Sequence, residues 1–454
     1  MNQENRTPKV AKVNVNALEQ INLNAAGIDI GAEELYVAVP GDRNEESVRV
    51  FGTFTVDLYA LADWLKACRI DTVAMESTGV YWVPLYDVLE ERGFSVYLVN
   101  ARHLKNVSGR KTDVLDCQWI QQLHTYGLLN ASFRPAEEIR AVRSLVRHRE
   151  MLVQYRSAHI QHMQKALIQM NVRLTNVLSD ITGVTGMQII RAIVAGEHNP
   201  KILAAFRKAQ CAKSPQEIEK SLQGTYKREH IFTLKQAVEL YDFYERQIQA
   251  CDQELEALYQ QFEPPDEPGT PPPTPRRGKP RKNQANFDLA QSLFQMTGVD
   301  LTQIDGLDAL TVQTILSITG IHMNAWPTAK HFASWLHICP NNKITGGKIK
   351  HRGTLPSQNR AAVALRVAAL SLRRSDSALG AFFRRIRTLH GTPVAITATA
   401  HKLARIFYAM LKDRTPYHDP GATYFEQQHR ERAVNSLKRR AATLGFALEP
   451  MPSV

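Results

Sequence analysis

The stretch NAAGIDIG, residues 24–31, decides the fold of the N-terminal part of this chain. It is a short apolar run, and two strand-like runs follow it, ELYVAVP (34–40) and SVRVFGTF (47–54). Turn signals such as PGDRN (40–44) separate these runs. Short runs rich in β-branched and aromatic residues, joined by tight turns, predict three consecutive strands in an antiparallel meander.

Helical and strand-like segments alternate after these runs. Leu61, Trp64 and Leu65 have helical spacing in the segment 58–68. A strand, a helix, a strand and a helix follow, namely DTVAME (71–76), VPLYDVLEERG (83–93), FSVYLVN (94–100) and KTDVLDCQWIQQL (111–123). Strands that alternate with helices favour right-handed parallel crossovers. The whole order predicts an α/β RNase H-like (RuvC-like) domain, in which helices cover a mixed five-stranded sheet.

Four carboxylates in this region carry the candidate chemistry. Asp29 lies inside the first apolar run, where an ionised side chain is costly unless it is paired or bound to metal. Glu76 ends a later strand, and Asp113 and Asp116 lie one turn apart on one helix face. Hard oxygen ligands of this kind suit Mg²⁺ or Mn²⁺. We therefore predict that the four acids form one catalytic metal site, although each alone could be a turn residue, a helix cap or a surface acid.

The rest of the chain reads as mostly helical. The stretch 137–170 has apolar residues at three-, four- and seven-residue spacing, typical of a helical hairpin or coiled coil. We expect it to pair subunits, with packing inside one chain as the alternative.

Seven prolines between Pro264 and Pro275 predict an extended spacer. The predicted parts are a flexible N-terminus (1–23), the RuvC-like domain (24–135), a helical or coiled-coil region (136–262), a Pro-rich basic linker (263–285), a mostly α-helical C-terminal domain (286–415) and a tail (416–454).

Charge points to a polyanionic partner. The 454 residues include 56 Lys and Arg against 44 Asp and Glu, which gives a net charge of +12. Such an excess favours binding to nucleic acids, because Lys and Arg release the counterions condensed on the phosphates that they neutralise. The segment 346–388 is strongly basic, with Asp376 as its single acid. QIDGLDALTVQTILSITGI (303–321) has the pattern of two short helices around a glycine turn, which can present N–H groups to a phosphate, although plain helix packing explains it equally well. The predicted nucleic-acid contacts are Arg110, Lys111, Lys343, Lys348, Lys350, Arg352, Arg360, Arg366, Arg373 and Arg374.

Composition also limits the location of the protein. No apolar run approaches the roughly 20 residues needed to span a bilayer, and the opening MNQENRTPKV lacks a signal-peptide core. The five cysteines are scattered without a CxxC pair, which indicates reduced thiols rather than structural zinc. We expect a cytoplasmic protein with no membrane partner.

Four motifs resemble one known family. GIDIG (27–31), AMESTGVYW (74–82), LVNARHLKNVSGRKTDVLDCQWI (98–120) and FASWLHICPNNKITGGK (332–348) are similar to motifs of the DEDD insertion-sequence transposases, the bridge-RNA-guided recombinases. The resemblance covers about residues 24–175 and 290–413. It implies a RuvC-like metal site at Asp29, Glu76, Asp113 and Asp116, and a C-terminal serine that attacks DNA and forms a covalent intermediate. It also implies a non-coding guide RNA, DNA element ends and target as substrates, and a homodimer or homotetramer.

This sequence departs from the family at the nucleophile. The segment that resembles Ser-Gly-Gly-Lys reads Thr-Gly-Gly-Lys, which places Thr345 at the expected serine. Threonine offers the same hydroxyl beside an added methyl group, so attack is more crowded. Ser334 and Ser357 are alternative nucleophiles, and Thr345 could instead cap the loop. Two other functions stay open: a RuvC-like structure-specific endonuclease that uses metal-activated water, and a non-catalytic nucleic-acid scaffold.

Overall fold

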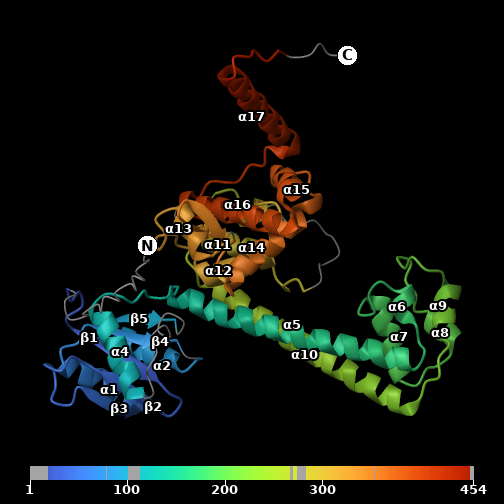
Figure 1. Cartoon of the computed structure of the whole chain (residues 1–454). Coiled ribbons are helices and arrows are strands. Elements are labelled where there is room, and N and C mark those ends of the chain that lie inside the picture. The colour runs from blue at the N-terminus through green and yellow to red at the C-terminus, as the bar shows by residue number, and fades with distance from the viewer. Residues whose placement is uncertain are drawn as a thin grey trace, which may run out of the picture. The chain divides into compact units, whose positions relative to one another are not determined.

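The structure is a computed structural model that describes residues 19–77, 79–100, 113–265, 269–272, 283–351 and 353–449. The chain folds into two compact units, Met1–Arg134 and Pro135–Val454 (Figure 1). Among the described helices, none combines the length and the apolar character that crossing a lipid bilayer requires.

The first unit is built on the mixed five-stranded sheet that the sequence predicts. The strands lie in the order β3-β2-β1-β4-β5; β1 pairs antiparallel with β2 and β2 with β3, whereas β1 pairs parallel with β4 and β4 with β5. This is the RNase H-like arrangement, so the predicted fold class is confirmed. The elements are β1 (Ala25–Ile30), β2 (Glu34–Ala38), β3 (Val48–Gly52), α1 (Thr55–Ala67), β4 (Thr72–Glu76), α2 (Trp82–Glu91), β5 (Ser95–Val99) and α4 (Asp113–Thr125).

Two hydrophobic clusters cover the two faces of this sheet. Ile28 and Met75 join the larger cluster, to which α1 and α2 contribute residues such as Leu61 and Leu89. Ala74 instead belongs to the cluster on the other face, together with residues of β5 and α4. Side chains alternate along a strand, so residues of β1 and β4 that neighbour Ile28 and Met75 point toward the α4 face.

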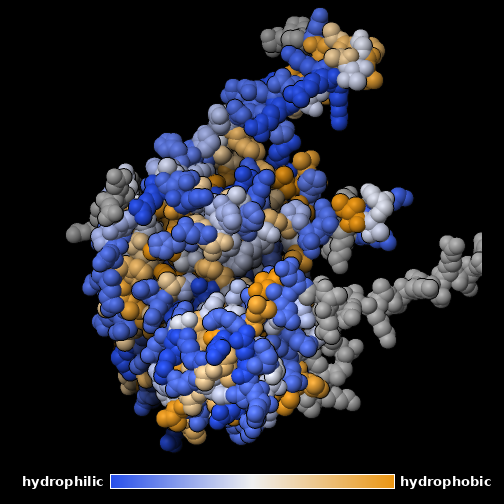
Figure 2. Space-filling view, turned by 90° about the vertical axis from the view of Figure 1, so that its left-hand side faces the viewer, coloured by the Kyte–Doolittle hydropathy of each residue, from blue (hydrophilic) through white to orange (hydrophobic). Residues whose placement is uncertain are grey.

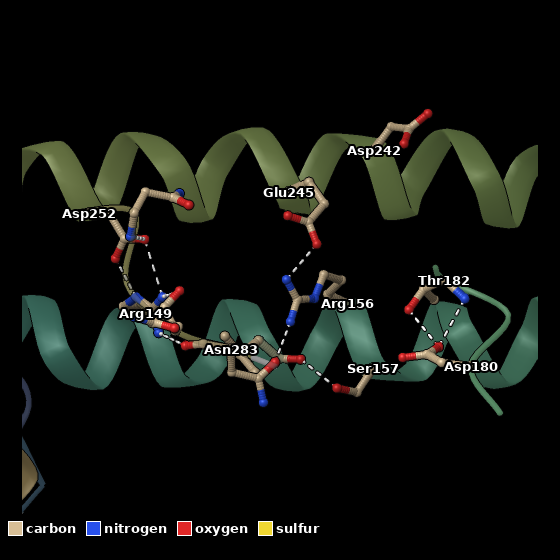
Figure 3. A network of polar contacts seen from close by, with 12 residues as sticks. Arg149, Arg156, Ser157, Asp180, Thr182, Asp242, Glu245, Asp252 and Asn283 are labelled. Atoms are coloured by element: carbon tan, nitrogen blue, oxygen red, sulfur yellow. Dashed lines mark hydrogen bonds and ion pairs between the residues drawn. The ribbon is translucent and has the colours of Figure 1, made fainter. Parts of the chain in front are cut away.

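The second unit begins with a long helical hairpin. Helices α5 (Glu137–Gln169) and α10 (Arg228–Gln260) pack along each other, and the pairs Arg149–Asp252 and Arg156–Glu245 show that they run antiparallel (Figure 3). The apolar stripe of α5 is therefore covered within the same chain. This finding favours the alternative reading of that stripe and removes it as an argument for subunit pairing. Short helices follow α5 and precede α10, namely α6 (Leu174–Val177), α7 (Val184–Val194), α8 (Pro200–Ala204) and α9 (Pro215–Ser221).

The remaining elements form a second helical body in this unit. Gly306 has a left-handed φ of +87° and precedes the last helix of the predicted helix pair, but the first partner is only a single 3-10 turn. The tail contains one helix, α17. The elements are α11 (Leu289–Thr297), η2 (Leu301–Gln303), α12 (Ala309–Thr319), α13 (Ala329–Trp335), β6 (Lys343–Thr345), β7 (Lys348–His351), α14 (Arg360–Ser371), η3 (Leu372–Arg374), α15 (Ala378–His390), α16 (Thr392–Asp413) and α17 (Gly421–Thr443).

A buried ion pair fastens the chain segment after the linker to the helical hairpin. Arg149 and Asp252 are both buried and form two hydrogen bonds, one of them 3.1 Å long (Figure 3). The Arg149 guanidinium also donates to the carbonyls of Asn283 and Gln284, each at 3.2 Å, and Asp252 accepts from the backbone N–H of Asn286. Both charges thus have several partners, which is the condition for a buried pair to be tolerated.

We expect Asp252→Leu to lower the free energy of unfolding by about 3–5 kcal/mol, because it leaves the Arg149 charge buried without its carboxylate. The double variant Arg149→Met with Asp252→Leu should recover most of this loss, since an apolar pair of similar volume carries no buried charge. Asp242→Ala on the same helix, whose partner Arg191 is exposed, serves as the control and should cost less than about 1 kcal/mol. Urea unfolding measures all three, and equal losses for Asp252→Leu and Asp242→Ala would contradict the account.

Candidate active site

Two of the predicted acids lie side by side at the ends of parallel strands. Asp29 follows Ile28 in β1 and Glu76 follows Met75 in β4, and Ile28 is the register partner of Met75. Continuing that register places Asp29 alongside Glu76. Both residues point to the α4 face, since their neighbours Ile28 and Met75 face the opposite cluster. Both side chains are half-buried.

The other two acids lie in the first turn of α4, which packs on β1. Asp113 is exposed and Asp116 is half-buried. The next residue, Cys117, is fully buried, and burial raises the pKa of its thiol to about 12. Gln121 Nε2 donates to the backbone carbonyl of Ala25 over 3.4 Å. This contact joins the second half of α4 to the amino end of β1, and Cys117, one turn earlier in α4, lies against Gly27. The first turn of α4 therefore lies toward the carboxyl end of β1, and the charges of Asp113, Asp116 and Glu76 all act on Asp29.

Gly27 is a positioning residue that the sequence analysis did not single out. A Cβ atom at Gly27 would clash with the backbone of α4, at the carbonyl oxygen of Cys117 and the amide nitrogen of Gln121. Backbone atoms cannot rotate out of the way, so only glycine lets α4 lie this close to β1. A glycine inside a strand often marks such a close backbone approach, and this signal was present in AAGID.

We expect Gly27→Ala to push α4 away from β1 and to cost about 1–3 kcal/mol of stability, as overpacking does. Because α4 carries Asp113 and Asp116, the shift of α4 should also lower the rate of metal-dependent DNA cleavage, even at temperatures where the variant is fully folded. Gly41→Ala is the matched control, because a Cβ atom there meets nothing within 4 Å. Thermal unfolding and a cleavage assay at a temperature where both variants are folded measure the two effects. Full activity of Gly27→Ala would show that the close packing of α4 is not required.

The four acids interact electrostatically. Burial and, in decreasing order, the negative charges of Asp113, Asp116 and Glu76 together raise the pKa of Asp29 to about 6, although the hydrogen bond from the Ile30 backbone lowers it. A carboxyl group with three acids near it favours a bound proton or a bound cation. The three other predicted acids are therefore close enough to Asp29 for their charges to act on its carboxyl group.

The four carboxylates are ligands of the type that binds a divalent metal. As the side chains are placed, however, they do not surround one point. No three His, Cys, Asp or Glu side chains of the described residues stand close enough together to hold an ion as they are placed. The donors are all carboxylates, the hard oxygen ligands that Mg²⁺ and Mn²⁺ prefer. A cation bound among them would also relieve the repulsion that raises the pKa of Asp29. Asp29, Glu76, Asp113 and Asp116 are thus the residues that would hold it.

The predicted nucleophile lies at the tip of a hairpin in the second unit. Thr345 ends β6 and pairs with Lys348, the first residue of β7, across the two-residue turn of Gly346 and Gly347. Both glycines have positive φ, +56° and +74°, as a type I′ turn requires. Thr345 is exposed, and its hydroxyl makes no hydrogen bond to any described residue. Among the described residues, the hydroxyl thus has no partner in the loop that it would cap.

The two alternative nucleophiles differ in their surroundings. Ser334 lies on α13 and is exposed. The Ser357 hydroxyl accepts a hydrogen bond of 3.2 Å from the backbone N–H of Asn359, the residue that caps α14. Ser357 thus has a structural role at a helix start, whereas Thr345 is the hydroxyl that stands on a turn with open space around both following glycines.

The predicted nucleic-acid contacts fall into three groups. Lys348, Lys350, Arg373 and Arg374 are exposed and make no ion pair with the described residues. Two arginines have partners inside the chain: the Arg360 guanidinium pairs with Glu150 of α5, and Arg366 Nη2 donates to the carbonyl oxygen of His337 over 3.2 Å. Arg110, Lys111 and Arg352 lie outside the described residues, and for Lys343 only the backbone is described.

An RNase H-like sheet with acids gathered at the ends of its central strands defines a class of enzymes that transfer phosphodiester bonds. A sequence model described as transposase, of the DEDD IS110 type, matches residues 26–172. A second model, described as transposase of the IS116/IS110/IS902 family, matches residues 300–384. The chain belongs to this IS110 family of DEDD insertion-sequence transposases, and it is an enzyme of DNA transposition. No curated protein matches the chain at a significant level.

Proposed function

We propose that this transposase cuts and rejoins DNA through a covalent hydroxyl–phosphate intermediate, with Thr345 as nucleophile and the four acids as its metal site. The observation that carries the proposal is the exposed Thr345 hydroxyl at the tip of the β6–β7 hairpin, in a family of DNA-transferring enzymes. A simple nuclease needs no second reactive group of this kind.

The chain's own residues would divide the work as follows. Asp29, Glu76, Asp113 and Asp116 would hold Mg²⁺ or Mn²⁺, which would supply the positive charge that phosphodiester transfer needs. Gly346 and Gly347 leave room for a phosphate next to Thr345, and Lys348 supplies charge at the phosphate that is attacked. The Thr345 hydroxyl loses its proton to solvent and its oxygen bonds to phosphorus. The bond from phosphorus to the deoxyribose oxygen breaks, and this oxygen takes a proton from solvent and leaves as a free hydroxyl. A second DNA end then reverses the step, so rejoining needs no ATP.

Further partners belong to the same proposal. We include a non-coding guide RNA because of the family resemblance and the net charge of +12. We include a homodimer or homotetramer because of the family resemblance alone. Of the nucleic-acid contacts predicted from the sequence, Lys348, Lys350, Arg373 and Arg374 are described, exposed and without an ion pair to a described residue. A place of action on the nucleoid of a prokaryotic cell agrees with these partners.

Strand transfer between the element's own ends tests the proposal, with and without RNA transcribed from those ends. We expect joined products only when the purified protein, Mg²⁺ and the RNA are all present, and RNA binding that weakens steeply with salt because many phosphates are contacted. Adding back RNA of shuffled sequence is the control. Efficient, site-specific joining by nuclease-treated protein that holds no RNA would overturn the guide-RNA part and leave the nucleophile assignment to its own test.

The four acids suit a RuvC-like structure-specific endonuclease equally well. Such an enzyme would hydrolyse the phosphodiester with a metal-activated water and would form no bond between protein and DNA. The presence or absence of a covalent adduct therefore separates the two functions.

A further inference from the structure

A cavity of about 560 Å³ lies among α15, α16 and α17, beyond the β6–β7 hairpin in sequence. Its size is typical of small-ligand sites. Most of its lining comes from α16 and α17, which follow the end of the matched region at residue 384. Neither the four acids nor Thr345 lines it. The docking of α17 is fixed by Asp419, whose carboxylate accepts from the backbone N–H of Ala378 over 3.0 Å, and by the backbone hydrogen bond from Ala422 N to Asp376 O.

The lining is positively charged. Lys402, Arg405 and Arg432 all contribute to it, whereas the described residues that line the cavity include no Asp or Glu. None of the three cations forms an ion pair with a described residue. Burial lowers the pKa of Lys402, and the charges of Arg432 and Arg405 lower it further. Three neighbouring cations that lack a carboxylate favour an anionic ligand.

Aromatic rings line the same cavity. The lining includes Tyr417, Tyr424 and Phe425. Lys402 Nζ lies 5.5 Å from the ring centre of Phe425 and 3.9 Å from that of Phe382, a ring outside the lining that meets Phe425 edge to face. The Tyr424 ring is 52% exposed, and its hydroxyl accepts from Gln428 Nε2 over 3.3 Å. An exposed ring held beside cations can stack on a planar group while the cations bind its phosphate.

A second cavity of about 430 Å³ continues this surface along α17. It shares Phe425 and His429 with the first cavity and adds Arg384, Arg385 and Arg430, with Glu426 as its acid. No residue of α17 is buried, and hydrophilic side chains cover most of this helix on the face that Figure 2 shows. The two cavities together thus present basic and aromatic side chains along α17.

We propose that the cavity among α15, α16 and α17 binds single-stranded nucleic acid, with an unstacked base on Tyr424 and its phosphate between Arg405, Lys402 and Arg432. A duplex keeps its bases stacked inside, so it can reach the cations but not the ring. Single-stranded RNA and single-stranded DNA share the required chemistry. This inference does not depend on Thr345 or on the metal site.

The test measures binding of fluorescent oligouridine RNA, oligothymidine DNA and a DNA duplex, each about 20 units long, to the full chain without divalent metal. We expect Tyr424→Ala combined with Arg432→Gln to weaken binding of a single strand about tenfold. The slope of log affinity against log salt should also fall by about 0.7 for the lost phosphate contact. Tyr424→Ala alone should weaken single-strand binding and leave duplex binding unchanged.

Arg439→Gln combined with Arg440→Gln is the matched control, since both residues are exposed on α17 and line neither cavity. It should change single-strand affinity less than the cavity variants do. A loss confined to RNA or to DNA identifies the strand that the site takes. Unchanged affinity of Tyr424→Ala for both single strands, or an equal loss in the control, would overturn the proposal. Binding is measured without divalent metal and requires no DNA cleavage, so failure of the catalytic proposal would leave this result untouched.

Discussion

Asp29→Asn should abolish metal-dependent cleavage and joining of DNA, by at least about 10³-fold, which corresponds to about 4 kcal/mol of transition-state stabilisation. Asparagine keeps the shape of aspartate but removes the charge that a divalent cation needs. The same variant should make the metal-free protein more stable. Asp29 is half-buried near Asp113, Asp116 and Glu76, and its ionised form is disfavoured there, as the raised pKa of about 6 indicates. A functional site that costs stability is a common trade-off.

Two measurements separate this explanation from simple unfolding. Mg²⁺ should raise the melting temperature of the unmodified chain by mass action and should have little effect on Asp29→Asn. Glu33→Gln, which removes an exposed acid from the β1–β2 turn, is the control and should keep both activity and the response to Mg²⁺. Normal strand transfer by Asp29→Asn, or an unaltered response to chelation of Mg²⁺, would show that the four acids are not the metal site.

Thr345→Ala should eliminate the covalent protein–DNA adduct while DNA and RNA binding persist. The side chain is exposed on a two-residue turn and makes no hydrogen bond to the described residues, so its loss costs the fold little. Thr345→Ser keeps the hydroxyl and removes the methyl group that crowds it, and should retain or raise activity. The pair of variants thus tests the hydroxyl separately from the shape of the hairpin.

Ser334→Ala and Ser357→Ala serve as controls for the nucleophile. Ser334→Ala should be neutral, and Ser357→Ala should at most destabilise the start of α14, where its hydroxyl accepts from Asn359 N–H. Adduct formation is followed on denaturing gels with end-labelled DNA. An adduct that persists in Thr345→Ala and maps to either serine would move the nucleophile to that residue.

The sheet and its acids were accessible from sequence because their signals are local. Apolar runs alternate with turns and helices from Asn24 to Leu123, and this order allows few topologies. The period-two pattern of β1 places Asp29 opposite to Ile28, and the helical period places Asp113 and Asp116 on one face. The closeness of α4 to β1 could not be derived in this way, because it depends on a missing side chain at Gly27 that meets residues some 90 positions away.

Contacts between residues far apart in the sequence could not be predicted from the periodicity of the sequence. The apolar stripe of α5 fits a partner in another subunit as well as one in the same chain, and only the fold shows that α10 covers it. Arg360 and Arg366 read as surface cations, yet they contact Glu150 and the His337 carbonyl. A charge count cannot distinguish cations that bind phosphate from cations that have such internal partners. The cavity beside Tyr424 could not be predicted from the sequence either, because it forms only where α17 packs near α15 and α16.

One measurement tests the central claim most directly. The unmodified chain is incubated with end-labelled element DNA, its RNA and Mg²⁺, and the reaction is stopped with detergent. After digestion, mass spectrometry locates the DNA-linked peptide. The account predicts a phosphothreonine link at Thr345, which requires Mg²⁺ and is lost in Asp29→Asn. Cleaved DNA that carries no protein at any time in the reaction would contradict it, and would identify a hydrolytic, RuvC-like reaction instead.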